Sequence, residues 1–374
     1  MTESAAAPQV VDLLGYEVVI GPWLLDDAGR RIAAAAPAHT IAVVTDENVG
    51  PLAAPQLVGS LRHFAPHTRV LLKAIPAGES QKVRETWTML TDWLLDERCG
   101  RDTTVVALGG GVVGDLAGFV AATFMRGVPF VQVPTTLLAM VDASVGGKVG
   151  VDTRHGKNLV GAFHQPATVL ADPTVLQTLP AEHLRAGFAE VLKHGIIADA
   201  GYFARARQVG EGLFATNATE VAWHGDALAD LVAGSVRIKA AVVSRDEREH
   251  GLRQVLNFGH TIGHAVELLS DFSMLHGEAI AIGMCVEARL AEATAVARPG
   301  LAAAVRDAVR AIGLPVAVPG SMQPDALIEA MRLDKKARAG RLVMALPESI
   351  GTMASASTGI PVDTALVRAV VTEA

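Results

Sequence analysis

The first half of the chain alternates short runs of β-branched and aliphatic residues with segments of helical spacing. This alternation is typical of βα units stacked around a mainly parallel sheet. The clearest helical segments are residues 81–97 and 116–124. The expected strands are residues 17–20, 41–45, 69–73, 103–108, 130–133 and 168–171. The pattern therefore predicts an N-terminal α/β domain with a Rossmann-like, mainly parallel sheet.

From about residue 174 the pattern changes to long helices. Apolar residues recur every three or four positions in residues 181–197, 221–245, 254–269, 279–293 and 301–312. A β-hairpin is expected in residues 341–346 and 352–356. We expect residues 1–173 to form the α/β domain and residues 174–374 an all-helical C-terminal domain apart from that hairpin. A ligand cleft is expected between the two domains.

Composition limits the class of protein. The chain has 374 residues, which suggests two domains, and only 4% are aromatic, so the core should be aliphatic. A net charge of -7 argues against affinity for nucleic acid or anionic membranes. Cys99 and Cys285 form no disulfide framework and fit a reducing compartment. Because the apolar runs are too short for a bilayer and no export signal opens the chain, we expect a cytoplasmic protein.

Three histidines fall between residues 253 and 278. His260 and His264 are four residues apart and would share one helix face, and His276 returns after a break. Two imidazoles and a carboxylate from elsewhere would form a three-ligand zinc site with open positions for substrate. Thr261 stands where a metalloprotease HExxH motif has its glutamate, so that class loses its general base. The alternative is that these histidines belong to the core or the helix surface.

A glycine-rich loop follows the strand that ends at Leu108 and opens the next helix. Glycines let the backbone approach a pyrophosphate, and a helix N-terminus offers free N–H groups. The acidic residue of the usual Rossmann fingerprint is absent, because Pro134 and Thr135 stand at its place. Acidic residues that could bind ribose or adenosine hydroxyls instead lie earlier: Asp46 ends a strand, and Glu79, with Lys82, opens the helix after the third strand. A tight turn without a ligand is the alternative.

Basic residues gather in motifs despite the acidic net charge. Lys148 follows a glycine pair, which would make an anion pocket, although a solvated surface lysine is the alternative. Glu190 and Lys193 lie one helical turn apart, and Glu190 is our candidate for the carboxylate that completes a metal site. Further polar and basic candidates are Arg126, Asp142, Asn158, Lys239, Glu249, Arg253, Lys335 and Lys336.

Taken together, these motifs closely resemble the 3-dehydroquinate synthase family of sugar phosphate cyclases. The matching segments are GGGVVGDLAGF, MRG, VPTTLLAMVDASVGGK, GKNLVGAFHQP, LPAEHLRAGFAEVLKHG, LRQVLNFGHTIGHAVE, LHGE and DKKARAG. They run from about Asp46 to Gly340, and their joint occurrence in this order is highly specific. The resemblance implies an NAD-binding α/β domain, a helical domain that binds metal and substrate, one divalent cation (Zn²⁺ or Co²⁺) and a homodimer.

The resemblance also assigns individual residues. Glu190, His260 and His276 resemble the zinc ligands, and Glu249 and His264 match the positions of proton transfer. The residues that resemble NAD contacts are Asp46, Glu79, Lys82, Gly110, Gly111, Val112, Asp115, Thr135, Thr136, Lys157 and Thr178. The residues that resemble substrate contacts are Arg126, Asp142, Lys148, Asn158, Lys193, Lys239, Arg253, Asn257 and Lys336. In the family, Arg126 would reach into the partner subunit's site.

The implied substrate is 3-deoxy-D-arabino-heptulosonate 7-phosphate, whose carboxylate and phosphate both need fixed cations. The resemblance implies transient oxidation by NAD⁺, β-elimination of phosphate, re-reduction and intramolecular aldol closure to 3-dehydroquinate, a step of the shikimate pathway. NAD would be a catalyst and not a net reactant. Val149 follows Lys148 where the family often has threonine, which bears on substrate orientation.

Three alternatives remain open at the level of sequence. A 2-deoxy-scyllo-inosose or 2-epi-5-epi-valiolone synthase would act on a substrate without the carboxylate and should lack the cations that Lys148, Lys239 and Arg253 supply. A metal-dependent polyol dehydrogenase would consume NAD stoichiometrically and needs no such cations. A non-enzymatic NAD-binding regulator would be expected to have lost a ligand or an acid/base residue, and none is missing.

Overall fold

The computed structural model describes residues 7–215, 225–249, 251–333, 342–354 and 359–372. The chain divides into two compact units, Met1–Pro180 with Gly225–Ala240 and Ala181–His224 with Ala241–Ala374. The first unit thus extends beyond the expected boundary at residue 173 and also includes residues 225–240. Asp172 ties the end of the expected domain to the start of its first helix. The Asp172 carboxylate accepts hydrogen bonds from the backbone N–H groups of Trp23 (3.1 Å) and Leu25 (3.2 Å).

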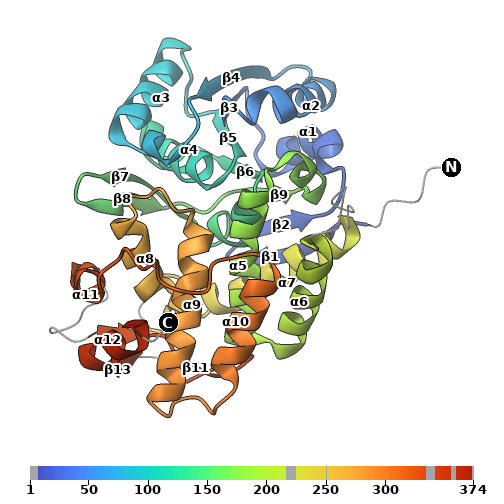
Figure 1. The fold of residues 1–374 in the computed structure, drawn as a ribbon. Coiled ribbons are helices and arrows are strands. Elements are labelled where there is room, and N and C mark those ends of the chain that lie inside the picture. The colour runs from blue at the N-terminus through green and yellow to red at the C-terminus, as the bar shows by residue number, and fades with distance from the viewer. Residues whose placement is uncertain (1–6, 216–224, 250, 334–341, 355–358, 373–374) are drawn as a thin grey trace. The chain divides into compact units, whose positions relative to one another are not determined.

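The first unit is built on a sheet whose described strands follow the order β1-β2-β9-β6-β5-β3-β4 (Figure 1). These strands are β1 (Gln9–Leu13), β2 (Tyr16–Ile20), β3 (Thr40–Asp46), β4 (Arg69–Ile75), β5 (Thr103–Gly109), β6 (Phe130–Pro134) and β9 (Thr168–Ala171). Every neighbouring pair is parallel except β1 and β2, which form an antiparallel hairpin. The predicted strands and the mainly parallel sheet are confirmed, whereas β1 was not predicted.

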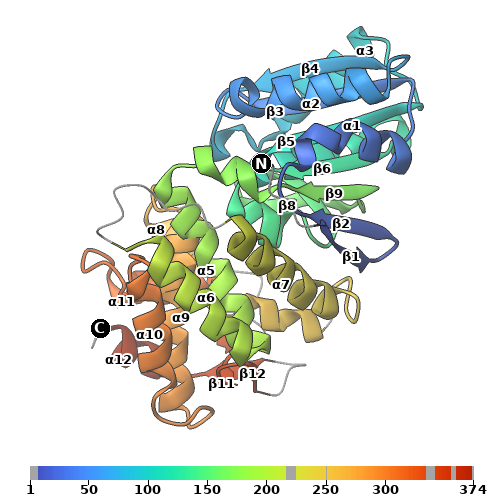
Figure 2. The same cartoon turned by 90° about the vertical axis from the view of Figure 1, so that its right-hand side faces the viewer.

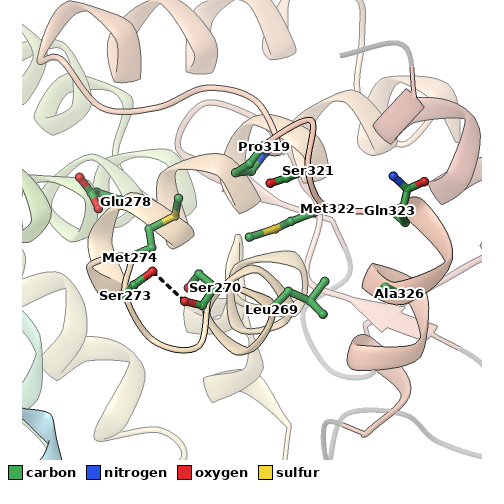
Figure 3. Close-up of a pocket in the computed structure, with 10 residues that line it drawn as sticks. All are labelled: Leu269, Ser270, Ser273, Met274, Glu278, Pro319, Ser321, Met322, Gln323 and Ala326. Atoms are coloured by element: carbon green, nitrogen blue, oxygen red, sulfur yellow. Dashed lines mark hydrogen bonds between the residues drawn. The ribbon is translucent and has the colours of Figure 1, made fainter.

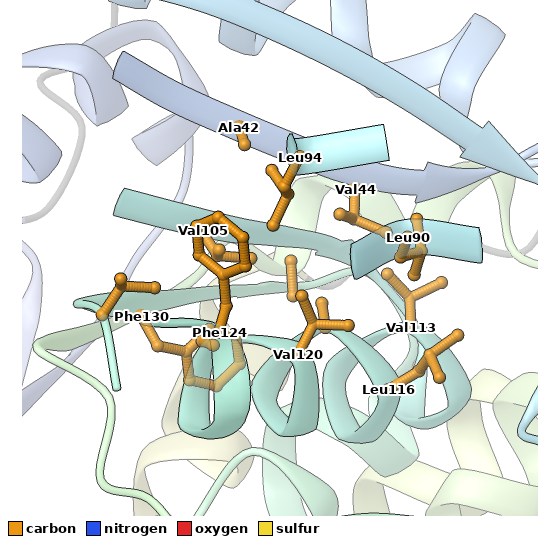
Figure 4. Packing of buried hydrophobic residues seen from close by; sticks show 14 of the residues in the cluster. Ala42, Val44, Leu90, Leu94, Val105, Val113, Leu116, Val120, Phe124 and Phe130 are labelled. Carbon is orange, nitrogen blue, oxygen red and sulfur yellow. The ribbon is translucent and has the colours of Figure 1, made fainter. Parts of the chain in front are cut away.

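The two faces of this sheet are covered by different helices, α1 (Leu24–Ala35), α2 (Gly50–Phe64), α3 (Arg84–Asp96) and α4 (Gly111–Thr123). Successive side chains of a strand point to opposite faces. On β5, Val105 and Ala107 therefore pack in a core with α3 and α4, shown in Figure 4. Val106 and Leu108 pack on the other face with α1 and α2, which lie side by side in Figure 2. Burial on both faces explains why the strands are continuous apolar runs.

Two local predictions in this unit need correction. Helix α3 begins at Arg84 and not at residue 81, because a 3₁₀ turn, η1 (Glu79–Gln81), precedes it. Helix α4 begins at Gly111 and not at residue 116, so the glycine run forms its first turn. Lys148 and the residues after it, for which no strand was predicted, form an antiparallel hairpin of β7 (Lys148–Thr153) and β8 (Gly156–Phe163). The remaining described turns are η2 (Phe124–Arg126), η3 (Ala139–Ala143), η4 (Pro173–Thr178) and η5 (Leu252–Asn257).

The second unit is mainly helical, as predicted. Its helices are α5 (Ala181–Ala198), α6 (Ala200–Leu213), α8 (His260–Leu269), α9 (His276–Ala293), α10 (Leu301–Ala311), α11 (Pro324–Leu333) and α12 (Thr364–Thr372), while α7 (Gly225–Val243) runs from the first unit into the second. Two short antiparallel pairs accompany them, β10 (Leu342–Met344) with β13 (Ile360–Val362) and β11 (Pro347–Ser349) with β12 (Thr352–Met353). The pairing of the predicted late hairpin is therefore wrong among the described residues: residues 342–344 pair with β13, and the partner of β12 is β11, which lies after the predicted first strand. Residues 341, 355 and 356 of the prediction lie outside the described residues.

The helix predicted over residues 254–269 is broken in two. Turn η5 ends at Asn257, Gly259 has a φ of +80°, and α8 begins at His260. The break coincides with a close approach of α9. A Cβ added to Gly283 would lie 1.8 Å from the carbonyl oxygen of Gly259 and 2.9 Å from the backbone nitrogen of Gly263. Only a glycine at residue 283 lets the two backbones come this close.

Among the described helices, none combines the length and the apolarity that a bilayer span requires.

The close approach of α8 and α9 makes a stability prediction. Gly283→Ala should lower the free energy of unfolding by about 1–3 kcal/mol, because the new methyl group must displace backbone atoms of α8. Gly59→Ala on α2 is the matched control, since an added Cβ there meets nothing within 4 Å. The control should be neutral or stabilising by up to about 1 kcal/mol. Denaturant unfolding of the three proteins measures both effects, and an unchanged Gly283→Ala protein would contradict this packing.

Candidate metal centre and nucleotide site

The candidate metal centre is organised around Glu190 on α5, whose side chain has an exposed fraction of 0%. Lys193 follows one turn later, is equally buried, and forms an ion pair with Glu190 Oε2. A buried carboxylate is tolerated only when opposite charges or hydrogen-bond donors compensate it. The anion that Lys193 faces in the described structure is therefore the carboxylate of Glu190.

Two histidines direct ring nitrogens at the other oxygen of Glu190. The Nε2 atoms of His260, at the start of α8, and His276, at the start of α9, each lie 3.7 Å from Glu190 Oε1. One donor atom from each of the three residues lies within 4.8 Å of the others. Ligand atoms that surround zinc tetrahedrally at 2.0–2.2 Å are about 3.4 Å apart. This donor set, two imidazoles and a carboxylate, thus fits a divalent cation of the zinc type with little rearrangement.

The opposite ring nitrogens fix the orientation of both rings. His260 Nδ1 lies 3.1 Å from the carbonyl oxygen of Phe258, and His276 Nδ1 lies 3.3 Å from Glu267 Oε2. Both partners are acceptors, so each Nδ1 must carry a proton and donate it. The Nε2 atoms are thereby left to face Glu190, which is the arrangement that metal-binding histidines usually have.

His264 lies beside this group. Its ring centroid is 5.3 Å from that of His260 and 6.2 Å from that of His276. It also forms a second possible group with Glu267 and His276. The spacing of His260 and His264 brings both rings together as expected, but the trio with Glu190 uses His260 and His276. His264 therefore lies next to that trio without belonging to it.

The electrostatics of His276 follow from its neighbours. Burial opposes its protonation, but the carboxylates of Glu190 and Glu267 outweigh burial and raise the pKa of His276 from 6.5 to about 10. A raised pKa in the folded state stabilises the protein at pH values below 6.5, and this contribution is lost as the pH rises through about 10. A cation at Nε2 must displace that proton.

Other predicted residues of the second unit lie close to the helix break. Asn257 Nδ2 donates to Glu249 Oε1 at 3.0 Å, and Glu249 has a left-handed φ of +60°. Arg253 is 3% exposed, and its Nη1 donates to the carbonyl oxygen of Glu247 at 2.5 Å. Lys335 and Lys336 lie outside the described residues.

The candidate nucleotide site belongs to the first unit. Strand β3 lies between β4 and β5 in the sheet. The chain passes from β3 to β4 at the edge and then returns to β5 on the opposite side of β3, so the direction of strand addition reverses between β3 and β5. In open α/β sheets, ligands bind outside the carboxyl ends of the strands at such a point. Asp46 ends β3 there, and Gly110, Gly111 and Val112 begin α4 after β5.

The backbone around this point leaves groups for a ligand. Asp46 Oδ1 accepts hydrogen bonds from the N–H groups of Asn48 and Val49, both at 2.9 Å, which fixes the carboxylate at the strand end. A Cβ on Gly110 would lie 3.0 Å from Thr136 Cγ2, so α4 begins directly against the residues after β6. The first N–H groups of a helix have no intrahelical acceptor, which suits a phosphate.

Lys82 links several of the predicted NAD contacts. Its Nζ lies 2.5 Å from Asp115 on α4 and donates to Asn158 Oδ1 at 2.5 Å. Burial alone would lower the pKa of Lys82, but the negative charges of Asp115, Glu79 and Asp152 outweigh it and raise that pKa. Lys82 therefore stays charged.

The other predicted NAD contacts make separate local interactions. Lys157 Nζ lies 3.4 Å from Glu79. The backbone N–H of Thr135 donates to the carbonyl oxygen of Gly109 at 3.0 Å, and Thr178 Oγ1 donates to Val175 at 3.0 Å.

Two of the expected substrate contacts bind one another. Lys239 Nζ donates to the backbone oxygen (2.5 Å) and Oδ1 (2.6 Å) of Asp142. Lys148 and Arg126 are exposed, and Arg126 has a left-handed φ of +68°.

The sequence reasoning missed three acidic residues that hold the expected ones in place. Asp152 Oδ1 accepts the N–H of Asn158 at 2.7 Å, Glu267 binds His276, and Glu287 binds the start of α8. Glu267 could have been found, because it lies seven residues after His260 and so on the same helix face. Asp152 and Glu287 give no such local signal.

A surface pocket of about 680 Å³ lies elsewhere in the second unit (Figure 3). It is lined by Leu269, Ser270, Ser273, Met274, Glu278, Pro319, Ser321, Met322, Gln323 and Ala326. None of the residues predicted for metal, NAD or substrate is among them, so this pocket is not part of the candidate site.

Two solved structures of enzymes are similar to this chain throughout. One is 2-deoxy-scyllo-inosose synthase complexed with carbaglucose-6-phosphate, NAD⁺ and Co²⁺, which is 26% identical, has a TM-score of 0.85, and aligns over 98% of this chain and 100% of that chain. The other is 2-epi-5-epi-valiolone synthase from Streptomyces hygroscopicus with NAD⁺ and Zn²⁺ bound, with 31% identity, a TM-score of 0.84 and 98% of each chain covered. Fold and site together define an enzyme of the sugar phosphate cyclase class.

Sequence comparison narrows this class. Family models described as 3-dehydroquinate synthase N-terminal and 3-dehydroquinate synthase C-terminal match residues 72–186 and 187–337. The 3-dehydroquinate synthase of Desulforamulus reducens is 44% identical over 337 residues, which cover 90% of this chain and 91% of the relative. The chain belongs to the 3-dehydroquinate synthase family.

The raised pKa of His276 predicts that metal binding releases protons. At pH 8 the metal-free ring is protonated, because its pKa is about 10, and a cation must take the place of that proton. Zinc affinity should therefore rise about tenfold per pH unit between pH 7 and 8.5. Calorimetric titrations in buffers of different ionisation enthalpy count the protons released. A His276→Ala variant should release about one proton fewer, and a pH-independent wild-type affinity would contradict the raised pKa.

Proposed function

We propose that the chain converts 3-deoxy-D-arabino-heptulosonate 7-phosphate to 3-dehydroquinate and phosphate, as a carbon–oxygen lyase of the shikimate pathway. The observation that carries the proposal is the convergence of Glu190, His260 and His276 in a chain of this family. The substrate would be oxidised transiently, lose phosphate by β-elimination, be reduced again at the same carbon and close its ring by aldol addition.

The residues present fit both expected cofactors. Glu190, His260 and His276 would hold Zn²⁺ or Co²⁺, which supplies a Lewis acid that makes a bound hydroxyl more acidic. The start of α4, with Asp46 and Lys82 beside it, would hold NAD⁺, which supplies a hydride acceptor and returns the hydride later in the cycle. Binding of NAD⁺ with Co²⁺ or Zn²⁺ by the two structural relatives supports this assignment.

The protein's own groups would handle protons and charge. His264 and Glu249 are the candidates for proton transfer, and Asn257 orients Glu249 through its 3.0 Å hydrogen bond. His264 could equally bind the phosphate that leaves, since that phosphate can itself accept a proton. Lys193 neutralises part of the negative charge of Glu190, so the two histidines are not the only groups that stabilise this buried carboxylate.

The preference for a carboxylated substrate is supported by fixed cations. Lys239 is held by Asp142, Arg253 is buried and held by the Glu247 carbonyl, and Lys148 begins β7. A cyclase whose substrate has no carboxylate would not need all three. The higher identity to 3-dehydroquinate synthase, 44% against 26% and 31% for the two other cyclases, points the same way.

We further propose that the chain acts as a homodimer in which Arg126 reaches the partner's site. Met125 and Arg126 are exposed on η2, directly after α4, and both have left-handed backbone conformations. When the Arg126→Ala and His276→Ala variants are mixed and form heterodimers, activity should be recovered. In each heterodimer, one site combines the intact His276 of one subunit with the intact Arg126 of its partner.

The function is tested by incubating the pure chain with the heptulosonate phosphate, zinc and a catalytic amount of NAD⁺. Phosphate should be released in large excess over NAD⁺ without accumulation of NADH, and His276→Ala should abolish the release. Accumulating NADH would instead indicate a dehydrogenase, and the absence of both would indicate a binding protein. Glucose 6-phosphate as an alternative substrate should give no phosphate, which separates this activity from a cyclase that needs no carboxylate.

A further inference from the structure

Helices α8 and α9 each begin with a histidine of the candidate metal centre, and each also carries a buried glutamate directed at the other helix. Glu267 lies two turns into α8, with an exposed fraction of 3%, and Glu287 lies three turns into α9, with 0%. Carboxylates at this depth are costly unless they make strong hydrogen bonds. What each of them binds is therefore informative.

Glu267 of α8 orients the histidine of α9. Its Oε2 lies 3.3 Å from His276 Nδ1, while Nε2 of the same ring faces Glu190 Oε1 at 3.7 Å. The ring is thus held between two carboxylates of different elements. Rotation of the ring away from Glu190 would break the contact with Glu267, so the position of the donor nitrogen is set from α8.

Glu287 of α9 holds the start of α8. Its Oε2 accepts from the N–H of Gly259 at 2.6 Å, and its Oε1 accepts from Thr261 (3.1 Å) and Ile262 (3.2 Å). The first N–H groups of a helix have no intrahelical partners and are usually bound by the side chain of the residue before the helix. That residue is Gly259, which has no side chain. A carboxylate of α9 therefore supplies the cap and fixes the backbone on both sides of His260.

We propose that Glu267 and Glu287 are positioning residues that form a reciprocal brace, in which each helix sets the geometry of the metal ligand at the start of the other. The proposal rests on the metal site of the proposed function. Partners that orient metal-binding histidines generally influence metal affinity by about 10- to 100-fold. Neither glutamate need touch substrate or metal to have this effect.

Helix α9 offers a matched control for an ordinary cap. Glu292 lies on the same helix, and its Oε1 accepts from the N–H groups of Gly300 (2.8 Å) and Ala302 (2.9 Å) at the start of α10. Helix α10 carries no residue of the candidate metal centre. Removal of the Glu292 charge should therefore reduce stability through the same kind of interaction without disturbing the donors.

The test compares Glu267→Gln, Glu287→Gln and Glu292→Gln in the full chain. Zinc affinity is measured by competition with a chromophoric chelator, and the absorption spectrum of the Co²⁺-loaded chain reports ligand geometry. The first two variants should bind zinc about 10- to 100-fold more weakly and alter the cobalt spectrum. Glu292→Gln should lower the thermal midpoint and leave both metal readouts at wild-type values. Where Glu287→Gln does not fold, Glu287→Asp, which keeps the charge but withdraws it by one methylene, takes its place.

A double-mutant comparison tests whether Glu267 influences zinc affinity through His276. Because Glu267 acts through His276, Glu267→Gln should cause no further loss of zinc affinity in a His276→Ala background. Wild-type zinc affinity and cobalt spectra in both brace variants, or an equal loss in Glu292→Gln, would overturn the brace and leave the proposed function intact. A wild-type chain that binds no zinc would overturn the proposed function and the brace with it.

Discussion

The helical unit depends on the burial of one carboxylate. Glu190 has no exposed surface, and an isolated carboxylate in such a position would cost several kcal/mol. Lys193 compensates one oxygen, and the ring nitrogens of His260 and His276 converge on the other. Because three different helices supply these groups, the charge on Glu190 constrains how α5, α8 and α9 pack. In the proposed function a divalent cation completes this compensation.

The two glycines at the contact of α8 and α9 also help to position the histidines. A histidine can stand at the first position of α8 only because the chain breaks at Gly259, and that break is compatible with α9 only because residue 283 is a glycine. The start of a helix carries a partial positive charge, which disfavours a second cation nearby. Glu190, Glu267 and Glu287 lie close to the two helix starts and offset that effect. The candidate centre is therefore a property of the helix pair as much as of its ligands.

The sheet of the first unit could be predicted well from sequence. Its strands are buried on both faces, so they stand out as β-branched and aliphatic runs, and their order along the chain indicates parallel pairing. Strand β1 was missed because Asp12 interrupts its apolar residues, and β7–β8 were missed because their glycines resemble a loop. The break at Gly259 was missed because the apolar spacing continues across it from η5 into α8.

The candidate site was predictable to the extent that its residues lie in local motifs. The histidine spacing suggested a metal, and Glu190 was the candidate carboxylate from its own motif. The family resemblance selected His260 and His276 as its partners, and the structure brings the three together. Spacing alone left open which two of the three histidines would bind the metal. Glu287 lies 28 residues from the backbone group that it caps, and no periodicity connects the two. Side chains of this kind are found only once the packing is known.

Zinc K-edge X-ray absorption of the metal-loaded chain tests the central claim most directly. The account predicts two imidazole nitrogens and one carboxylate oxygen at about 2.0–2.2 Å from the zinc, with one imidazole lost in each of His260→Ala and His276→Ala. A sulfur ligand, or an imidazole count that neither variant changes, would contradict it.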